Sequence, residues 1–177
     1  MERDSGQAAE RFEALFERHH SHVAAYVRRR AGEAAVEDAV AETFLVAWRS
    51  LERLHGDPLP WLYGVARLVL ANDSRSRRRR LALWARLAGQ PQPSSAVCDE
   101  VSEPLRAALL ALGEREREAL LLIAWEGLTP AQAARASGCS AVAFRGRLYR
   151  ARRRLAQELA APAPNDCPAQ PKEAGGT

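Results

Sequence analysis

The chain has 177 residues, 47% of them hydrophobic, and carries a formal net charge of +4 with an isoelectric point near 9.4. It can therefore bury a core and should be globular, as one domain or two small ones. No apolar run approaches the roughly 20 residues of a membrane span, and the charged start MERDSGQAAERFE has no signal-peptide core. We therefore expect a cytoplasmic protein whose basic clusters matter more than its modest total charge.

The apolar periodicity predicts an all-α fold. Glycine and proline are sparse within the long periodic segments and dense between them, and strand-like alternation of β-branched residues is absent. The first half predicts helices at about 8–30, 34–54 and 58–80, the last of which could continue through 81–87. A segment rich in Pro, Gln and Ser then indicates a linker. We predict two small helical domains at 8–88 and 104–160, a flexible linker at 89–103, and a disordered tail at 161–177.

Neither the cysteines nor the histidines predict a metal site. The three cysteines are odd in number and far apart, which fits neither a disulfide framework nor a CxxC site. His19, His20 and His22 point in different directions on a helix, and no further residue completes a ligand set. The chain also lacks a phosphate-binding glycine loop and a nucleophile with a positioned base. We expect no cofactor and no enzymatic activity.

One face of the helix predicted at 34–54 mixes charge with an apolar side chain. Asp38 and Glu42 lie at one end of this face, Leu45 in the middle and Arg49 at the other end. One interpretation is a solvated face with charges at helical spacing. The other is a partner-binding face, because an exposed leucine among charges suits an interface better than bare solvent. The residues alone leave both interpretations open.

The helix predicted at 58–80 combines aromatic and basic side chains. Trp61 and Tyr63 stand near its start, and four consecutive arginines occupy 77–80. Cations that follow phosphates and rings that stack on bases are typical of nucleic-acid binding. The alternative is that Trp61 belongs to the core and that the arginine run is a solvated helix end.

The segment 129–154 predicts a helix-turn-helix. Ala134, Gly138 and Phe144 have the small, glycine and apolar spacing of that motif. Gly138 is expected to adopt the left-handed conformation that ends the first helix, and Ser140 to cap the second. Upstream of the motif, a short polar break is expected at 113–118 between two leucine-rich helical runs.

The second helix of this motif is expected to have an apolar side and a basic side. The apolar side chains are Val142, Phe144, Leu148 and Leu155. The basic ones are Arg145, Arg147, Arg150, Arg152, Arg153 and Arg154. An ordinary helical hairpin would explain the small residues and the glycine, but not six arginines within ten residues. We therefore predict a helix that enters a DNA major groove, where arginine pairs with phosphates or bidentately with guanine.

Three segments in order resemble the sigma-70 superfamily of bacterial sigma factors, in its small extracytoplasmic-function (ECF) group. VEDAVAETFLVAW resembles region 2.2 of that family, and PWLYGVARLVLANDSRSRRRR resembles regions 2.3 and 2.4. LGEREREALLLIAWEGLTPAQAARASGCSAVAFRGRLYRARRRL resembles region 4. Region 3 is missing, as in this group. The resemblance spans nearly everything from Phe12 to Leu155.

The resemblance implies a transcription initiation factor that binds core RNA polymerase and promoter DNA. Contacts with the β′ clamp helices and the β flap are expected, and an anti-sigma factor is the usual family arrangement. The positions that match the polymerase-binding segment are Asp38, Glu42, Leu45 and Trp48. Those that match the segments reading the minus-10 element are His55, Gly56, Asp57, Trp61, Tyr63, Arg67, Asn72 and Arg75. Those expected at the minus-35 element are Arg145, Arg147, Tyr149, Arg150, Arg152 and Arg153.

Two positions depart from the family pattern. Ala41 stands where relatives often have Gln, which removes one polar contact to the polymerase. Leu68 stands where relatives often have an Asn used in minus-10 recognition, so base choice is expected to rest more on the loop 55–57. The alternative function is a stand-alone helix-turn-helix regulator, which would normally dimerise on a palindrome and would leave the charged face of 34–54 unexplained.

Overall fold

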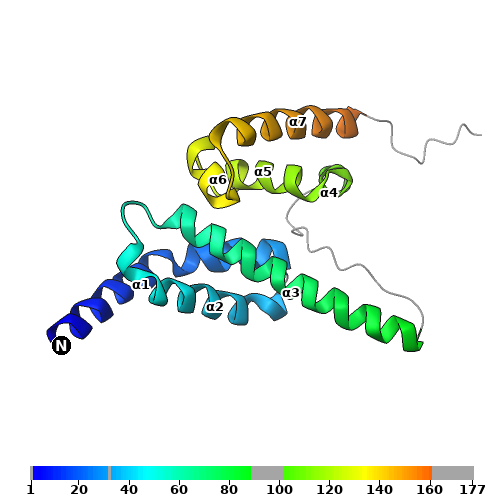
Figure 1. The fold of residues 1–177 in the computed structure, drawn as a ribbon. Coiled ribbons are helices and arrows are strands. Elements are labelled where there is room, and N and C mark those ends of the chain that lie inside the picture. The colour runs from blue at the N-terminus through cyan, green and yellow to red at the C-terminus, as the bar shows by residue number, and fades with distance from the viewer. Residues whose placement is uncertain (1, 32, 89–101, 161–177) are drawn as a thin grey trace, which may run out of the picture.

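The computed structural model describes residues 2–31, 33–88 and 102–160, and within those ranges it contains helices, turns and short loops but no strand (Figure 1). The predicted all-α class is confirmed. The first group of helices is α1 (Glu2–Ala31), α2 (Val36–Arg49) and α3 (Leu59–Ala88). The second group is α4 (Glu103–Ala111), α5 (Glu114–Ala124), α6 (Pro130–Ser137) and α7 (Ala141–Ala160). Most of the predicted linker and the whole predicted tail fall outside the described residues.

The first group packs α1, α2 and α3 against one another around a shared core (Figure 1). Apolar side chains at three- and four-residue steps on each helix turn inward, as the periodicity predicts. The fully or almost fully buried ones include Val23, Tyr26, Val27, Phe44, Ala47, Leu62 and Ala66. His19 is also buried in this stripe, while His20 and His22 are exposed.

The helix predicted at 34–54 is shorter than expected. The α-helical part is Val36–Arg49, flanked by 3-10 turns at Glu33–Ala35 (η1) and Leu51–Arg53 (η2). The backbone N–H of Ser50 bonds to the carbonyl of Ala47 three residues back, which tightens the chain out of the α-helix. The extended backbone of Leu54 then starts the loop, which turns at Gly56 with φ of 71°. Conversely, α1 begins earlier than position 8, in a polar stretch that apolar periodicity does not detect.

The second group shows one further difference from expectation. The polar stretch 113–118 is not a break, because α5 already begins at Glu114. Only Leu112 and Gly113 leave the helical conformation, with extended backbone at both. The acids Glu114 and Glu116 lie in the first turn of α5, where the positive end of the helix dipole favours them.

The turn between α6 and α7 forms as the sequence predicts. Thr129 caps α6 in a reciprocal pair with Gln132, and Pro130 occupies the first turn. Gly138 has φ of 64° and ψ of 38°, the left-handed conformation. The Ser140 hydroxyl accepts a hydrogen bond of 3.2 Å from the backbone N–H of Ala143 and so caps α7.

The apolar side of α7 is confirmed except at its first position. Phe144 and Leu148 are buried, and Leu155 packs against the same core. Val142 was expected on this side, and that prediction is wrong, because its side chain is 77% exposed. Phe144 is two residues further along the helix, so its inward direction places Val142 outward.

Two glycines of this motif should respond oppositely to alanine. Gly138→Ala places a Cβ in left-handed backbone and should lower the free energy of unfolding by about 1 kcal/mol. Gly146 lies inside α7, and a Cβ there would meet only the Arg150 side chain at 3.6 Å. Gly146→Ala should therefore be neutral or stabilising by up to about 1 kcal/mol. Urea unfolding followed by circular dichroism tests both, and equal effects would contradict the turn geometry.

Candidate functional site

The outward face of α2 carries an apolar centre with an acidic edge. Asp38 and Glu42 are exposed, and the large side chains of Leu45 and Trp48 are 48% and 44% exposed. Arg49 is also exposed. We call Asp38, Glu42, Leu45 and Trp48 the docking face. Large apolar side chains that stay in solvent among charges are typical of a protein-binding surface.

α1 enlarges this apolar area, which the sequence did not predict. The ring of Phe12 lies edge-on to Trp48 at 5.1 Å between centroids, and Phe16 continues from Phe12 at 6.3 Å. Phe16 is itself exposed. Both phenylalanines occur in the apolar stripe of 8–30, and a stripe alone does not show which of its members lie at the solvent edge.

The loop before α3 presents His55, Gly56 and Asp57 to solvent. One carboxylate oxygen of Asp57 accepts a hydrogen bond of 3.1 Å from the backbone N–H of Leu59 and so stabilises the start of α3. The other accepts a bond of 3.0 Å from the side-chain amide of Gln132 on α6. The loop is therefore exposed, and the bond between Asp57 and Gln132 connects it to the second group of helices.

The expected minus-10 residues on α3 are not equally accessible. Asn72 and Arg75, on the distal part, are exposed. Tyr63 is 2% exposed and stacks on Tyr26 with 4.8 Å between ring centroids. Trp61 is half-buried against the core, which agrees with the core interpretation of that residue.

α6 covers the middle of α3. The half-buried Arg67 donates a hydrogen bond of 3.4 Å from Nε to the carbonyl oxygen of Ala136. A Cβ on Gly64 would lie 3.2 Å from that same carbonyl oxygen, so only glycine lets the two helices approach this closely. Figure 1 shows α6 lying beside α3.

The outward side of α7 carries a surface that we call the arginine face. It comprises the exposed residues Arg145, Tyr149, Arg150, Arg152 and Arg153, with the half-buried Arg147 at its edge. None of these five guanidinium groups forms an ion pair within the described part of the chain, and Tyr149 is 69% exposed. Arg154 differs, because it pairs with Glu116 of α5 at 3.0 Å. The exposed Val142 extends the face toward the N-terminus of α7, and its three- and four-residue steps to Arg145 and Tyr149 were the signal for it.

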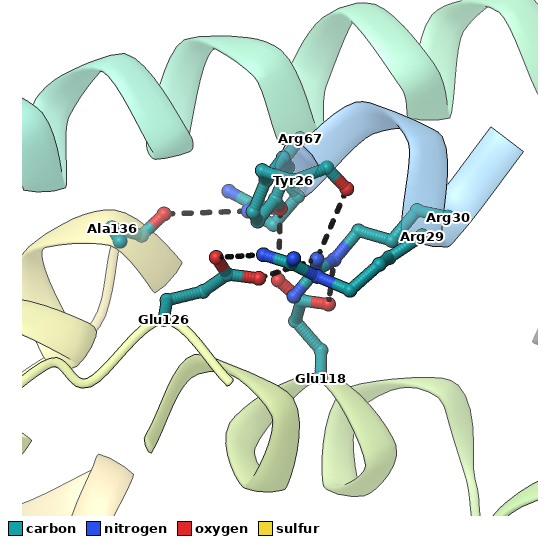
Figure 2. A network of polar contacts seen from close by, with 7 residues as sticks. All are labelled: Tyr26, Arg29, Arg30, Arg67, Glu118, Glu126 and Ala136. Carbon is teal, nitrogen blue, oxygen red and sulfur yellow. Dashed lines mark hydrogen bonds and ion pairs between the residues drawn. The ribbon is translucent and has the colours of Figure 1, made fainter. Parts of the chain in front are cut away.

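A network of charged residues joins the two groups of helices (Figure 2). Arg30 of α1 donates from Nε to Glu118 at 2.8 Å and from Nη1 to Glu126 at 2.9 Å. Arg29 donates to Glu126 as well, and the Tyr26 hydroxyl donates to Glu118 at 2.8 Å. The Arg30 guanidinium also lies over the Tyr26 ring, 3.6 Å from its centroid. We call these five side chains the ion-pair network.

Burial and charge shift the pKa values within and beside this network. Burial, and then the negative charge of Glu118, raises the pKa of Tyr26 well above its ordinary value. Burial would lower the pKa of Arg30, but Tyr26, Glu118 and Glu126 raise it above its ordinary value. Burial, followed by the charge of Glu126, raises the pKa of Tyr63 to about 12. Both buried phenols, Tyr26 and Tyr63, therefore stay neutral to a higher pH than a phenol in water.

The sequence matches sigma-70 region 2 over residues 15–80 and sigma-70 region 4 over residues 102–155. The chain belongs to the sigma-70 family. It is an RNA polymerase sigma factor of the ECF type, a transcription initiation factor that binds RNA polymerase and promoter DNA and directs the polymerase to promoters. The first group of helices contains the region 2 match and the second contains the region 4 match.

Several named relatives support this assignment. The sigma factor is 33% identical over 129 residues to the ECF RNA polymerase sigma factor EcfG of Rhodopseudomonas palustris, covering 70% of each chain. It is 31% identical over 166 residues to the RNA polymerase sigma factor CarQ of Myxococcus xanthus, covering 90% of this chain and 95% of CarQ. It is 39% identical over 137 residues to the probable sigma factor RfaY of Xanthomonas campestris, of which it spans only 34%.

A solved structure shares the fold. The structure of CnrH in complex with the cytosolic domain of CnrY is similar, with 27% identity and a TM-score of 0.61, over 88% of this chain and 96% of CnrH. Over the ranges that the structure describes, no helix is long and apolar enough to cross a membrane. Those ranges also hold no group of three or more His, Cys, Asp or Glu that could bind a metal ion.

The raised pKa of Tyr63 predicts a loss of stability at alkaline pH. The Tyr63 phenol ionises near pH 10 in the unfolded chain but only near pH 12 in the folded one. The stability that the neutral, buried phenol contributes is therefore complete below pH 10 and is lost between pH 10 and pH 12. The free energy of unfolding should fall by up to about 1.4 kcal/mol per pH unit in this window from this group. In urea unfolding at pH 10 to 12, the free energy of unfolding of Tyr63→Phe should fall less steeply with pH than that of the unaltered chain. Tyr149→Phe, a substitution at an exposed position, should behave like the unaltered chain.

Proposed function

We propose that this sigma factor divides promoter recognition among three surfaces. The docking face on α2 binds the β′ clamp helices of core polymerase, the loop 55–57 with α3 holds the opened minus-10 element, and the arginine face of α7 reads the duplex minus-35 element. The observation that carries the proposal is that one chain combines region 2 and region 4, each with an exposed surface of matching chemistry. In this assignment the domains are 8–88 and 104–160, joined by the linker 89–103.

The docking face has the chemistry that a helical partner requires. Leu45 and Trp48 supply exposed apolar area, and Asp38 and Glu42 supply charge at the edge. Apolar centres give affinity and charged rims select the partner and speed association. Phe16 lies at the edge of this area and is included in the proposed contact. Ala41, also exposed, adds no polar contact.

The arginine face has the chemistry of major-groove recognition. The first residues of a recognition helix reach base edges, and later ones contact the backbone. Arg145 and Tyr149 are therefore assigned to bases, together with Val142, whose apolar side chain suits a thymine methyl. The remaining arginines of the face are assigned to phosphates and to guanine edges. By family resemblance, region 4 also contacts the β flap.

The proposed minus-10 surface centres on the exposed loop and the distal part of α3. Extruding a base from the stack costs a few kcal/mol, so a pocket must hold it. His55, Gly56 and Asp57 are exposed and offer polar groups for that purpose. Asn72 and Arg75 are exposed on the helix that follows. Leu68, which is exposed among them, can contribute only an apolar contact.

We further infer that the sigma factor acts in the cytoplasm without catalysing a reaction, and that an anti-sigma factor controls it. The similar CnrH structure includes the cytosolic domain of a second protein, CnrY, which supports a regulatory partner of this kind. The exposed apolar docking face and arginine face are the surfaces that such a partner would cover.

Co-purification with core RNA polymerase lacking sigma, followed by run-off transcription on genomic fragments, tests the proposed function. Stable association and new start sites are expected, and the start sites would yield the promoter sequence. Failure to associate, together with tight binding of the free chain to duplex DNA, would instead favour a stand-alone helix-turn-helix regulator.

Arg150→Ala should reduce minus-35-dependent transcription about tenfold, because a base or phosphate contact is worth about 1–3 kcal/mol. Its binding to core polymerase should not change, because Arg150 is far from the docking face in sequence and on a different group of helices. Arg154→Ala is the matched control, since it removes the same charge from the same helix but Arg154 is paired with Glu116. An equal loss of transcription and polymerase binding in Arg150→Ala would contradict the division of labour.

Reversing both acids of the docking face should have the opposite result. Asp38→Arg combined with Glu42→Arg should abolish polymerase binding, because like charges would meet where opposite charges are expected. Glu33→Arg combined with Glu52→Arg is the control, with the same charge change at exposed positions at the two ends of α2. Pull-down with core polymerase measures both, and normal binding by the first double variant would remove the docking assignment.

A further inference from the structure

We propose that Leu68 is a specificity-determining residue, which selects a thymine in the opened minus-10 strand by apolar contact with the 5-methyl group of that base. The inference deepens the proposed function and rests on the assignment of α3 to the minus-10 element. Selection of this base depends on the position of Leu68 on α3, on its exposure to solvent and on the polar side chains beside it.

Leu68 lies at the centre of one stripe along α3. Trp61 precedes it by seven residues, Arg75 follows it by seven, and Asn72 follows it by four. Steps of four and seven residues keep these side chains on the same side of an α-helix. The helical rise places Leu68 and Asn72 about 6 Å apart along the axis, so the two side chains can contact a single base.

The Leu68 side chain does not contribute to the core. Leu68 is 55% exposed, although α6 packs on α3, and it lies outside the buried apolar cluster. Ala66 and Val69 of the same helix are buried on the side that faces the core. A single exposed leucine is ordinary on a protein surface. This one differs because it stands between Trp61 and Asn72, both of which are expected at the minus-10 element.

The residues that follow Leu68 supply the polar part of the site. Asn72 is exposed, and its side-chain amide can both donate and accept a hydrogen bond. The Nε of Arg75 donates to the carbonyl oxygen of Ala71 at 3.1 Å, which holds the exposed guanidinium back along the helix toward Leu68. This cation can contact the phosphates of a strand that lies along the stripe.

Thymine is the base that fits an apolar group beside a hydrogen-bond donor. Of the four bases, only thymine has a methyl group, and the carbonyl oxygen O4 lies next to it. Leu68 can bury the methyl group while the Asn72 amide donates to O4. Cytosine has no methyl group and carries an amino group in place of O4, and neither purine has a methyl group. These bases offer Leu68 no apolar contact, and their polar edges would lose hydration against it.

Replacement of thymine by deoxyuracil isolates the proposed contact, because these bases differ only in the methyl group. Holoenzyme assembled from this chain and core polymerase lacking sigma first selects sequences from random single strands of about 12 nucleotides, within the range that single-strand readers cover. Each thymine of a selected strand is then replaced singly by deoxyuracil. Fluorescence anisotropy of the labelled strands measures the ratio of the two affinities at each position.

Three substitutions at this position separate the apolar contact from other effects. Leu68→Asn and Leu68→Ala remove the contact, whereas Leu68→Met retains an apolar side chain. Leu159→Asn is the matched control, because it makes the same change at a leucine of α7 that is 48% exposed and belongs to none of the three proposed surfaces. Leu68 lies outside the core, so its variants should fold, and circular dichroism checks this. Alanine favours the helix, so Leu68→Ala decides if Leu68→Asn loses structure.

At one thymine of the selected strand, the unaltered chain, Leu68→Met and Leu159→Asn should bind thymine about fourfold more tightly than deoxyuracil, the effect of burying one methyl group. In Leu68→Asn and Leu68→Ala this preference should disappear.

A preference that persists in Leu68→Asn and Leu68→Ala, or a selected strand in which no thymine responds, would overturn the role of Leu68 and leave the proposed function intact. Weaker binding of every strand with an unchanged preference would indicate a wedge between bases, and would also overturn it. Failure of the holoenzyme to select any sequence would remove the minus-10 assignment of α3 itself, and the inference with it.

Discussion

The pairing of Arg29 and Arg30 with Glu118 and Glu126 joins the two halves of this sigma factor beside the packing of α6 on α3. The buried apolar side chains of the two halves form one continuous cluster, which includes Val23 and Leu62 of the first group and Leu122 and Phe144 of the second. The ion-pair network joins the halves in addition to this apolar contact, and Tyr26 contributes to it both a ring under Arg30 and a hydroxyl that donates to Glu118. Because these groups are buried, they must stay paired for as long as the halves touch.

This arrangement separates the three proposed surfaces by accessibility. The docking face and the arginine face point to solvent, whereas part of α3 is covered by α6. The three contacts are each expected to be weak and to add when they are joined through one polymerase.

Local hydrogen bonds and backbone conformation hold the helix-turn-helix of region 4 together. The cap of Thr129, the left-handed Gly138 and the hydroxyl of Ser140 satisfy the helix ends around the turn. Phe144 is fully buried at the centre and holds the recognition helix in one orientation. The direction of the arginine face follows from that anchor, which is also why Val142 turns outward.

The sequence by itself determined the helical class, the helix-turn-helix and its caps, the outward direction of most of the arginines, and the family. These depend on local spacing, on backbone preferences of glycine and on motifs, all of which can be seen in a single chain. Only the tertiary structure decided that Tyr63 is covered, that Phe16 borders the docking face, and that Glu118 and Glu126 meet Arg29 and Arg30. Nothing local marks these residues, because burial and pairing arise from contacts between separate helices, and the partners of the ion pairs stand nearly one hundred residues apart.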